Sequence, residues 1–296
     1  MIKEIGHFLL HLRLQYQLFI LSGGFLLGGL MADQMDTLHF WLQFLNVHVL
    51  LFGGATAFNS YWDKDEGPIG GLKNPPKMTD WMRMMSLVMM AAGWVWSALF
   101  GLIYFLIYGV SVLFFWLYST PLARWKSHPY LSLLAIAVST GFNSVLLGVI
   151  AAGGSVNSSV IISALGASMI LLSLYPVSQI YQLEQDKRRG DRTFAVEYGV
   201  DGVKFFFVIS YLFGMIFFSA GLLQIYPYPA VIFFILGLIS GVILLRLLLK
   251  LKGMESEYSS VMKMKFLASL SFVIFLMILN AIRYKWIGET VLINYF

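Results

Sequence analysis

The sequence contains no cysteine among its 296 residues, and charged residues are scarce. The absence of cysteine excludes a disulfide scaffold, and it also excludes zinc or iron–sulfur sites with thiolate ligands. Charged residues make up 12% of the chain and hydrophobic residues 59%, against about 25% and about 45–50% in soluble domains. These proportions exclude a soluble globular enzyme and a disordered chain, so we expect the lipid bilayer to surround most of the protein.

Among the few charged residues, basic residues outnumber acidic ones, and the net charge is +5. A basic protein could bind nucleic acid, but the basic residues of a membrane protein usually lie in loops that face an anionic leaflet. We therefore predict membrane lipid as the surrounding medium, no nucleic-acid partner and no obligate protein partner.

Nine apolar runs are long enough to cross a bilayer, which takes about 20 residues per helix. They cover residues 16–32, 39–58, 84–101, 103–119, 131–152, 158–180, 205–224, 230–248 and 266–282. The stretch 84–120 carries no charge and is too long for one helix, so we divide it near Gly101 into a helical hairpin. The sequence thus predicts an all-α integral membrane protein with nine transmembrane helices in a single domain, residues 1–296.

The basic residues test this division into spans. If the chain crosses nine times, 18 of its 20 basic residues fall on one side, and only Arg283 and Lys285 fall on the other. The positive-inside rule then places the N-terminus in the cytoplasm and the C-terminus on the far side, and we expect a bacterial inner membrane. Glycines at 23–24 and 28–29 indicate close helix packing in the first span, for which a cleaved signal peptide is the alternative.

Six of the fifteen acidic residues fall in two short segments, one after the second span and one after the sixth. Both segments read amide, three residues, Asp-Lys, two residues, Gly, beginning at Asn59 and at Gln182. A spacing of four residues places Asn59 and Asp63 on one helix face, and likewise Gln182 and Asp186. Glu184 reaches the same position only if its helix frays or the loop turns back.

Carboxylate and amide oxygens suit Mg²⁺, which binds proteins through one or two carboxylates together with substrate phosphates. Basic residues near the two segments could meet the other phosphate oxygens: Lys64, Lys73, Arg124, Lys126, Lys187, Arg188, Arg189 and Arg192. A third segment, after the fourth span, adds Tyr118 and Ser119 as hydrogen-bond donors. The pattern favours a ligand with a diphosphate head and a hydrocarbon tail. The alternative is that all three segments are solvated loops whose charges set the membrane topology, and that the aromatic residues of the third segment form an interfacial belt.

With these segments the chain resembles the UbiA-type superfamily of intramembrane prenyltransferases, in which nine membrane helices form a single bundle around a central cavity. Asn59 and Asp63 match two positions of the family's N-D-x-x-D-x-x-x-D motif after helix 2, and Asp186 matches the last Asp of its D-x-x-x-D motif after helix 6. Three further segments resemble the family's proline-bearing, Tyr-Ser…Lys and Gly-Asp-Arg-Thr…Gly stretches: 73–76, 118–126 and 190–199.

The chain departs from the family pattern at three positions. Ser60 and Gly67 stand where the first motif has Asp, and Gln182 stands where the second motif has Asp. Acidic residues nearby could substitute as ligands. The candidate metal ligands are therefore Asn59, Asp63, Asp65, Glu66, Gln182, Glu184 and Asp186.

The resemblance implies Mg²⁺-dependent transfer of an isoprenyl group from an allylic isoprenyl diphosphate to a lipophilic acceptor, often an aromatic ring, at a site that faces the cytoplasm. It implies catalytic roles for Asn59, Asp63 and Asp186. The implied diphosphate contacts are Lys73, Tyr118, Arg124, Lys126 and Arg192. An intramembrane terpene cyclase on the same scaffold is one alternative, and a small-solute transporter is another, although charges gathered at one membrane face disfavour transport.

Asn46, His48 and Asn143 lie within the predicted spans. Polar residues at membrane depth tend to face the protein interior. They are candidates for contacts with the acceptor, and helix–helix hydrogen bonds are the alternative.

Overall fold

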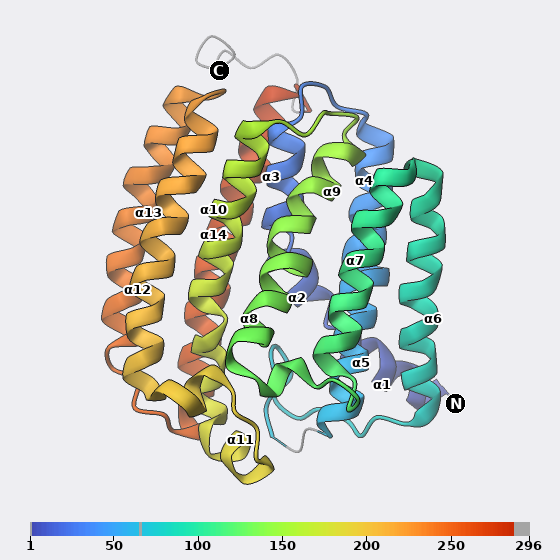
Figure 1. The fold of residues 1–296 in the computed structure, drawn as a ribbon, viewed down its shortest axis with the longest axis vertical. Coiled ribbons are helices and arrows are strands. Elements are labelled where there is room, and N and C mark those ends of the chain that lie inside the picture. Colours follow the sequence, from blue (N-terminus) through green and yellow to red (C-terminus); the bar gives the residue numbers. More distant parts are fainter. Residues whose placement is uncertain (1, 65–66, 287–296) are drawn as a thin grey trace.

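The computed structural model describes residues 2–64 and 67–286. Within these ranges the chain forms helices and loops, with a single isolated β-bridge between Ile69 and Leu72 and no strand. The long helices run side by side as one bundle, and the short helix α11 (Leu183–Arg189) lies at one end of it (Figure 1). We call this the α11 end.

The remaining elements follow in chain order. They are α1 (Ile2–Leu12), α2 (Leu14–Phe19), α3 (Gly23–Met31), α4 (Thr37–Leu45), the π-helix η1 (Asn46–Gly53), α5 (Gly54–Asp63), α6 (Asp80–Ser97), η2 (Ala98–Phe100), α7 (Leu102–Ser119), η3 (Trp125–Ser127), α8 (Pro129–Ile136), the π-helix η4 (Ala137–Phe142), α9 (Asn143–Ala151), α10 (Ser158–Leu174), η5 (Pro176–Gln182), α12 (Phe194–Leu223), α13 (Pro227–Leu248), η6 (Glu255–Glu257) and α14 (Tyr258–Arg283).

Eight helices of the described chain are long and apolar enough to cross a membrane, and a bent pair, Lys3–Phe19 with Gly23–Met31, makes a ninth span if counted as one. The predicted all-helical membrane fold is therefore confirmed. The first span differs in form from the prediction, because it bends by 43° between α2 and α3. The predicted hairpin is present, since Gly101 (φ 99°) turns the chain between η2 and α7.

Close packing of the first span on α9 explains one glycine on each side of the contact, Gly28 and Gly148. A Cβ atom added to Gly28 would lie 2.2 Å from the carbonyl oxygen of Val145, and one added to Gly148 would lie 2.1 Å from that of Phe25. No side chain fits at either position without moving a backbone, which is the use of small residues that is common between membrane helices. The predicted role of the first-span glycines in close packing is confirmed at Gly28.

Two of the polar residues at membrane depth join neighbouring helices. Tyr108 Oη donates to Asn46 Oδ1 at 3.0 Å, and Asn143 Nδ2 donates to Ser111 Oγ at 2.9 Å. The helix–helix alternative is therefore confirmed for both asparagines. His48 is fully buried, and its ring lies 2.7 Å from a carbonyl oxygen of its own helix.

The last long helix, α14, begins at Tyr258, ahead of the apolar run 266–282. Just before this start, the Glu257 carboxylate accepts hydrogen bonds from the backbone amides of residues 252–254 at 2.9–3.0 Å and so holds the turn η6. Because α14 begins at Tyr258, Lys265 lies about two turns inside the helix, or ~10 Å from its start, and not in a connecting loop.

Candidate active site

The end of α5 holds the first pair of candidate ligands. Asn59 and Asp63 lie on one helix face, as the spacing of four predicts, and Asn59 Nδ2 donates to Asp63 Oδ2 at 2.7 Å. Ser119, at the end of α7, donates its hydroxyl to Asn59 Oδ1 at 3.1 Å. The amide and the carboxylate are therefore held in place from two helices.

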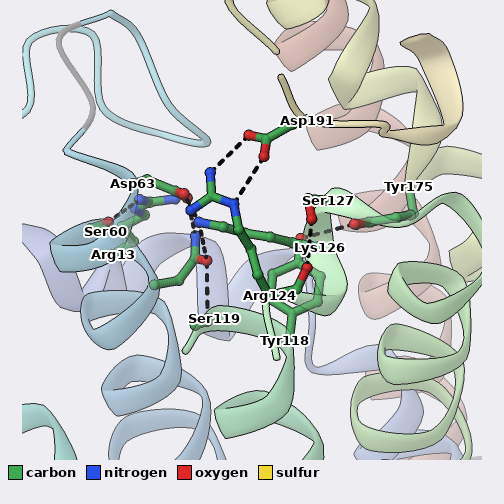
Figure 2. Close-up of polar contacts among 11 residues, drawn as sticks. Arg13, Ser60, Asp63, Tyr118, Ser119, Arg124, Lys126, Ser127, Tyr175 and Asp191 are labelled. Carbon is green, nitrogen blue, oxygen red and sulfur yellow. Dashed lines mark hydrogen bonds and ion pairs between the residues drawn. The ribbon is translucent and has the colours of Figure 1, made fainter. Parts of the chain in front are cut away.

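Lys126 brings a positive charge to the same point. Its ammonium pairs with Asp63 and lies 3.5 Å from Asn59 Oδ1, and Figure 2 shows the side chain directed toward α5. The side chain is 9% exposed. Burial lowers the pKa of Lys126 to about 7, while the carboxylates of Asp191 and Asp186 act in the opposite direction.

A second ion pair joins the loop after α7 to the loop after α11. Arg124 donates from Nε and from an Nη atom to the two oxygens of Asp191, both at 2.9 Å (Figure 2). The backbone amide of Arg192 also donates to the carbonyl of Ser127 at 3.0 Å. Bidentate pairs of this kind fix geometry as well as adding energy, so they set the position of the loop that carries Lys126.

Asp186 lies on α11 and is 8% exposed. Thr193 Oγ1 donates to its Oδ2 at 3.1 Å. Asp186 and Asp63 line one small pocket of about 100 Å³, together with Lys126 and Gln182. The structure therefore brings together the acidic segments that follow the second and sixth spans.

A much larger cavity of about 550 Å³ adjoins this small pocket. The two share several lining residues: Asp63, Tyr118, Tyr175, Ser178 and Gln182. Most of the other residues that line the larger cavity are apolar and come from α10, α12, α13 and α14. A polar pocket beside an apolar cavity suits a ligand with an anionic head and a hydrocarbon tail.

The donor set can be compared with what a metal ion needs. The described residues hold no group of three or more His, Cys, Asp or Glu side chains that could bind an ion alone. Mg²⁺ does not require one, because it binds through one or two carboxylates, substrate phosphates and waters. Asp63 and Asp186 on one pocket, with the amide oxygens of Asn59 and Gln182 nearby, fit Mg²⁺ bound together with a diphosphate.

Four of the candidates line neither cavity: Lys73, Arg124, Glu184 and Arg192. Arg124, a predicted diphosphate contact, is paired with Asp191. Lys73 is exposed in the loop between α5 and α6. Glu184 is exposed and pairs with Lys187 at 3.1 Å, and Arg192 is exposed and pairs with Glu197 at 2.9 Å. Two further candidates, Asp65 and Glu66, lie outside the described residues.

Other residues at the site carry no signal that stands out in the sequence. Arg13 is 9% exposed, lines the large cavity and donates to Ser60 Oγ at 2.6 Å. The Tyr175 hydroxyl lies 2.8 Å from that of Tyr118. In the sequence Arg13 looks like any basic residue that flanks a span, because its burial depends on packing between distant helices.

The comparisons with known proteins agree with this architecture. A UbiA homologue from Archaeoglobus fulgidus bound to DMAPP and Mg²⁺ superposes with a TM-score of 0.72 at 15% identity, over 93% of this chain and 99% of that one. The same homologue bound to GPP and Mg²⁺ gives the same values. A digeranylgeranylglyceryl phosphate synthase superposes with a TM-score of 0.65 at 20% identity, over 95% and 99% of the two chains.

No curated protein matches the chain in sequence. The sequence pattern of a family does match: residues 21–270, most of the chain, fit the UbiA prenyltransferase family. The family resemblance carried by the loop motifs is thereby confirmed, and the chain belongs to the UbiA prenyltransferase family.

Proposed function

We propose that this prenyltransferase moves an isoprenyl group from an allylic isoprenyl diphosphate to a lipophilic acceptor inside the membrane, with Mg²⁺ as cofactor. One observation carries the proposal. The carboxylates of Asp63 and Asp186 line a single polar pocket beside the Lys126 ammonium, and this pocket adjoins an apolar cavity of about 550 Å³. The similar Archaeoglobus fulgidus structures, which hold DMAPP or GPP with Mg²⁺, support it.

The residues of the pocket take separate roles in this proposal. Asp63 and Asp186 hold Mg²⁺, assisted by the amide oxygens of Asn59 and Gln182. When bound, Mg²⁺ supplies positive charge next to the diphosphate. Lys126 adds positive charge on the same side when it is protonated, where negative charge grows on the leaving group.

The reaction breaks the allylic C–O bond, and the electron pair leaves with the diphosphate. The acceptor then forms a bond to the allylic carbon and loses a proton. Competing water must be kept away from that carbon. The apolar wall of the large cavity, which includes Leu174, Phe233 and Phe272, serves this purpose.

We also propose that the α11 end faces the cytoplasm of a bacterial cell, because nearly all basic residues fall on that side of the nine-span topology. The diphosphate would then enter from the cytoplasm, and the acceptor would enter from the lipid.

The test uses the purified full chain in detergent with Mg²⁺, a panel of radiolabelled isoprenyl diphosphates from five to twenty carbons, and a panel of lipophilic acceptors. We expect a prenylated acceptor by mass spectrometry. Asp63→Asn and Asp186→Asn are expected to lower kcat/KM at least about a hundredfold, the scale of losing a ligand to a catalytic metal ion. Asp201→Asn is the matched control, since the Asp201 side chain is 96% exposed.

Three results would count against the proposal. Full turnover in both pocket variants would remove the site assignment. A product formed from the diphosphate alone would indicate a terpene cyclase. Solute uptake into proteoliposomes without diphosphate or Mg²⁺ would indicate a transporter.

A further inference from the structure

The outer face of α13 changes from apolar to basic near the α11 end. This helix lies at the edge of the bundle (Figure 1) and is apolar enough to cross a membrane, and Ile235 and Val242 are exposed on it two turns apart. Arg246 follows Val242 by four residues and so lies on the same face. Lys250 follows just past the end of the helix, and both basic side chains are exposed. Lipid tails therefore meet the apolar part of this face, and lipid headgroups meet its basic part.

The neighbouring helix α14 shows the same change. Leu267 and Ile274 are exposed on it two turns apart, and Lys263 precedes Leu267 by four residues on the same face. The chain runs from α13 into α14 through residues 249–257, so Lys263 lies at the α11 end as well. The outer faces of two consecutive membrane helices thus end in exposed cations at one end of the bundle.

Few acidic side chains balance these cations. Residues 202–254 contain no Asp or Glu. The connection between the two helices holds Glu257, which is buried and bound to backbone amides, and Glu255, which is exposed. Within the part of the chain that the structure describes, no acidic side chain forms an ion pair with any of the three cations. The surface is therefore complementary in charge to an anionic partner.

We propose that an anionic phospholipid binds this outer surface, with its headgroup phosphate beside Arg246 and Lys250 and its acyl chains along the exposed apolar residues of α13. Lys263 adds positive charge from α14. A guanidinium group suits a phosphate, because it can donate two parallel hydrogen bonds to the phosphate oxygens, and basic clusters at the ends of membrane helices attract anionic lipids. The three basic residues line neither cavity, so this site is separate from the proposed active site.

The test measures lipid binding to the purified full chain and needs no prenyl substrate. Thermal unfolding in detergent is followed through the intrinsic tryptophan fluorescence, since a ligand that binds the folded state raises Tm. The probes are phosphatidylglycerol, which is anionic, phosphatidylcholine, which has no net charge, and inorganic phosphate, which has no acyl chains. We expect phosphatidylglycerol alone to raise Tm, and native mass spectrometry to show it retained on the protein.

The variants test the residues. Arg246→Gln with Lys250→Gln should raise the phosphatidylglycerol concentration at half of the Tm shift about tenfold or more, since each basic residue near an anionic lipid surface strengthens binding about fivefold. Arg246→Lys with Lys250→Arg keeps both charges and should retain binding. Lys187→Gln with Lys204→Gln is the matched control. It removes the same net charge from the same end of the bundle, but each of these lysines is paired with a carboxylate at 3.1 Å.

Four results would overturn the proposal. Phosphatidylcholine could raise Tm as much as phosphatidylglycerol does, or inorganic phosphate could do so. The Arg246→Gln, Lys250→Gln variant could bind phosphatidylglycerol as tightly as the unaltered chain. Equal weakening in the control variant would show that net charge alone accounts for the attraction. None of these measurements involves turnover, so the lipid site is tested independently of the proposed function.

Discussion

The ion pair between Arg124 and Asp191 connects two loops that are 67 residues apart in the sequence. Both hydrogen bonds measure 2.9 Å, and the side chains are 32% and 8% exposed. We expect the pair to act as a positioning contact, because the loop that it anchors carries Lys126, which lines the small pocket. Removing it should both destabilise the fold and weaken diphosphate binding.

The size of the effect follows from burial. Removing one partner of a buried ion pair costs about 3–5 kcal/mol, whereas exposed pairs contribute about 0–1 kcal/mol. One partner here is nearly one-third exposed, so we expect a coupling free energy of ~2 kcal/mol between the two side chains. For a protein of this size that corresponds to roughly 5 °C in Tm. The KM of the diphosphate should rise about threefold or more, on the order of 1 kcal/mol of lost ordering.

A double-mutant cycle measures the coupling directly. The variants Arg124→Met, Asp191→Asn and the double variant are unfolded thermally in the same detergent, and the KM of the diphosphate is measured for each. The matched control is the cycle Lys204→Met and Asp201→Asn, an ion pair at 3.1 Å whose carboxylate is 96% exposed. A coupling below about 0.5 kcal/mol at Arg124 and Asp191, or one no larger than in the control cycle, would refute the assignment of a structural role.

The remaining predictions concern packing, orientation and the metal. Gly28→Ala is expected to lower the free energy of unfolding by ~2 kcal/mol or more through overpacking, which would be seen as a lower Tm. Gly6→Ala is the control and should leave Tm unchanged, since nothing lies within 4 Å of a Cβ added there. Equal Tm values for the two variants would contradict the close contact of Gly28 with α9. Because the chain has no cysteine, Lys73→Cys and Ser155→Cys each introduce a single thiol. A membrane-impermeant maleimide should label Lys73→Cys only in inside-out vesicles and Ser155→Cys only in right-side-out vesicles. The opposite labelling pattern would reverse the proposed orientation. Chelation of divalent cations should abolish turnover, and added Mg²⁺ should restore it. The Tm should change little, because Lys126 already pairs with one of the two pocket carboxylates. Turnover that survives chelation would remove Mg²⁺ from the proposal.

Local sequence patterns predict the parts of this protein that depend on local chemistry. The spans follow from runs of apolar residues, because the bilayer imposes a length on each helix. The contact between Asn59 and Asp63 follows from their spacing of four. The meeting of the end of α5 with α11 at the small pocket follows from topology, because both lie at the same end of the bundle (Figure 1).

Burial of individual charges could not be predicted in this way. Lys265 precedes an apolar run and looks like a loop residue, yet α14 begins at Tyr258, ahead of that run, and places Lys265 inside the bundle. The sequence does not indicate which acidic residue pairs with Arg124, since any acidic residue on the same side of the membrane could have done so. Such contacts depend on how distant helices pack, which no local pattern encodes.

The pairing of Lys126 with Asp63 has a consequence for the synthesis of the chain. Both residues belong to its first half, whereas Asp191, which fixes the loop that carries Lys126, belongs to the second half. Membrane proteins emerge from the ribosome N-terminal part first, so both partners of this ion pair are made before the segment that bears Asp186 and Asp191. A half-made chain in the translocon would therefore carry Asp63 together with its counter-charge, and the pocket would be completed only when Asp186 and Asp191 arrive.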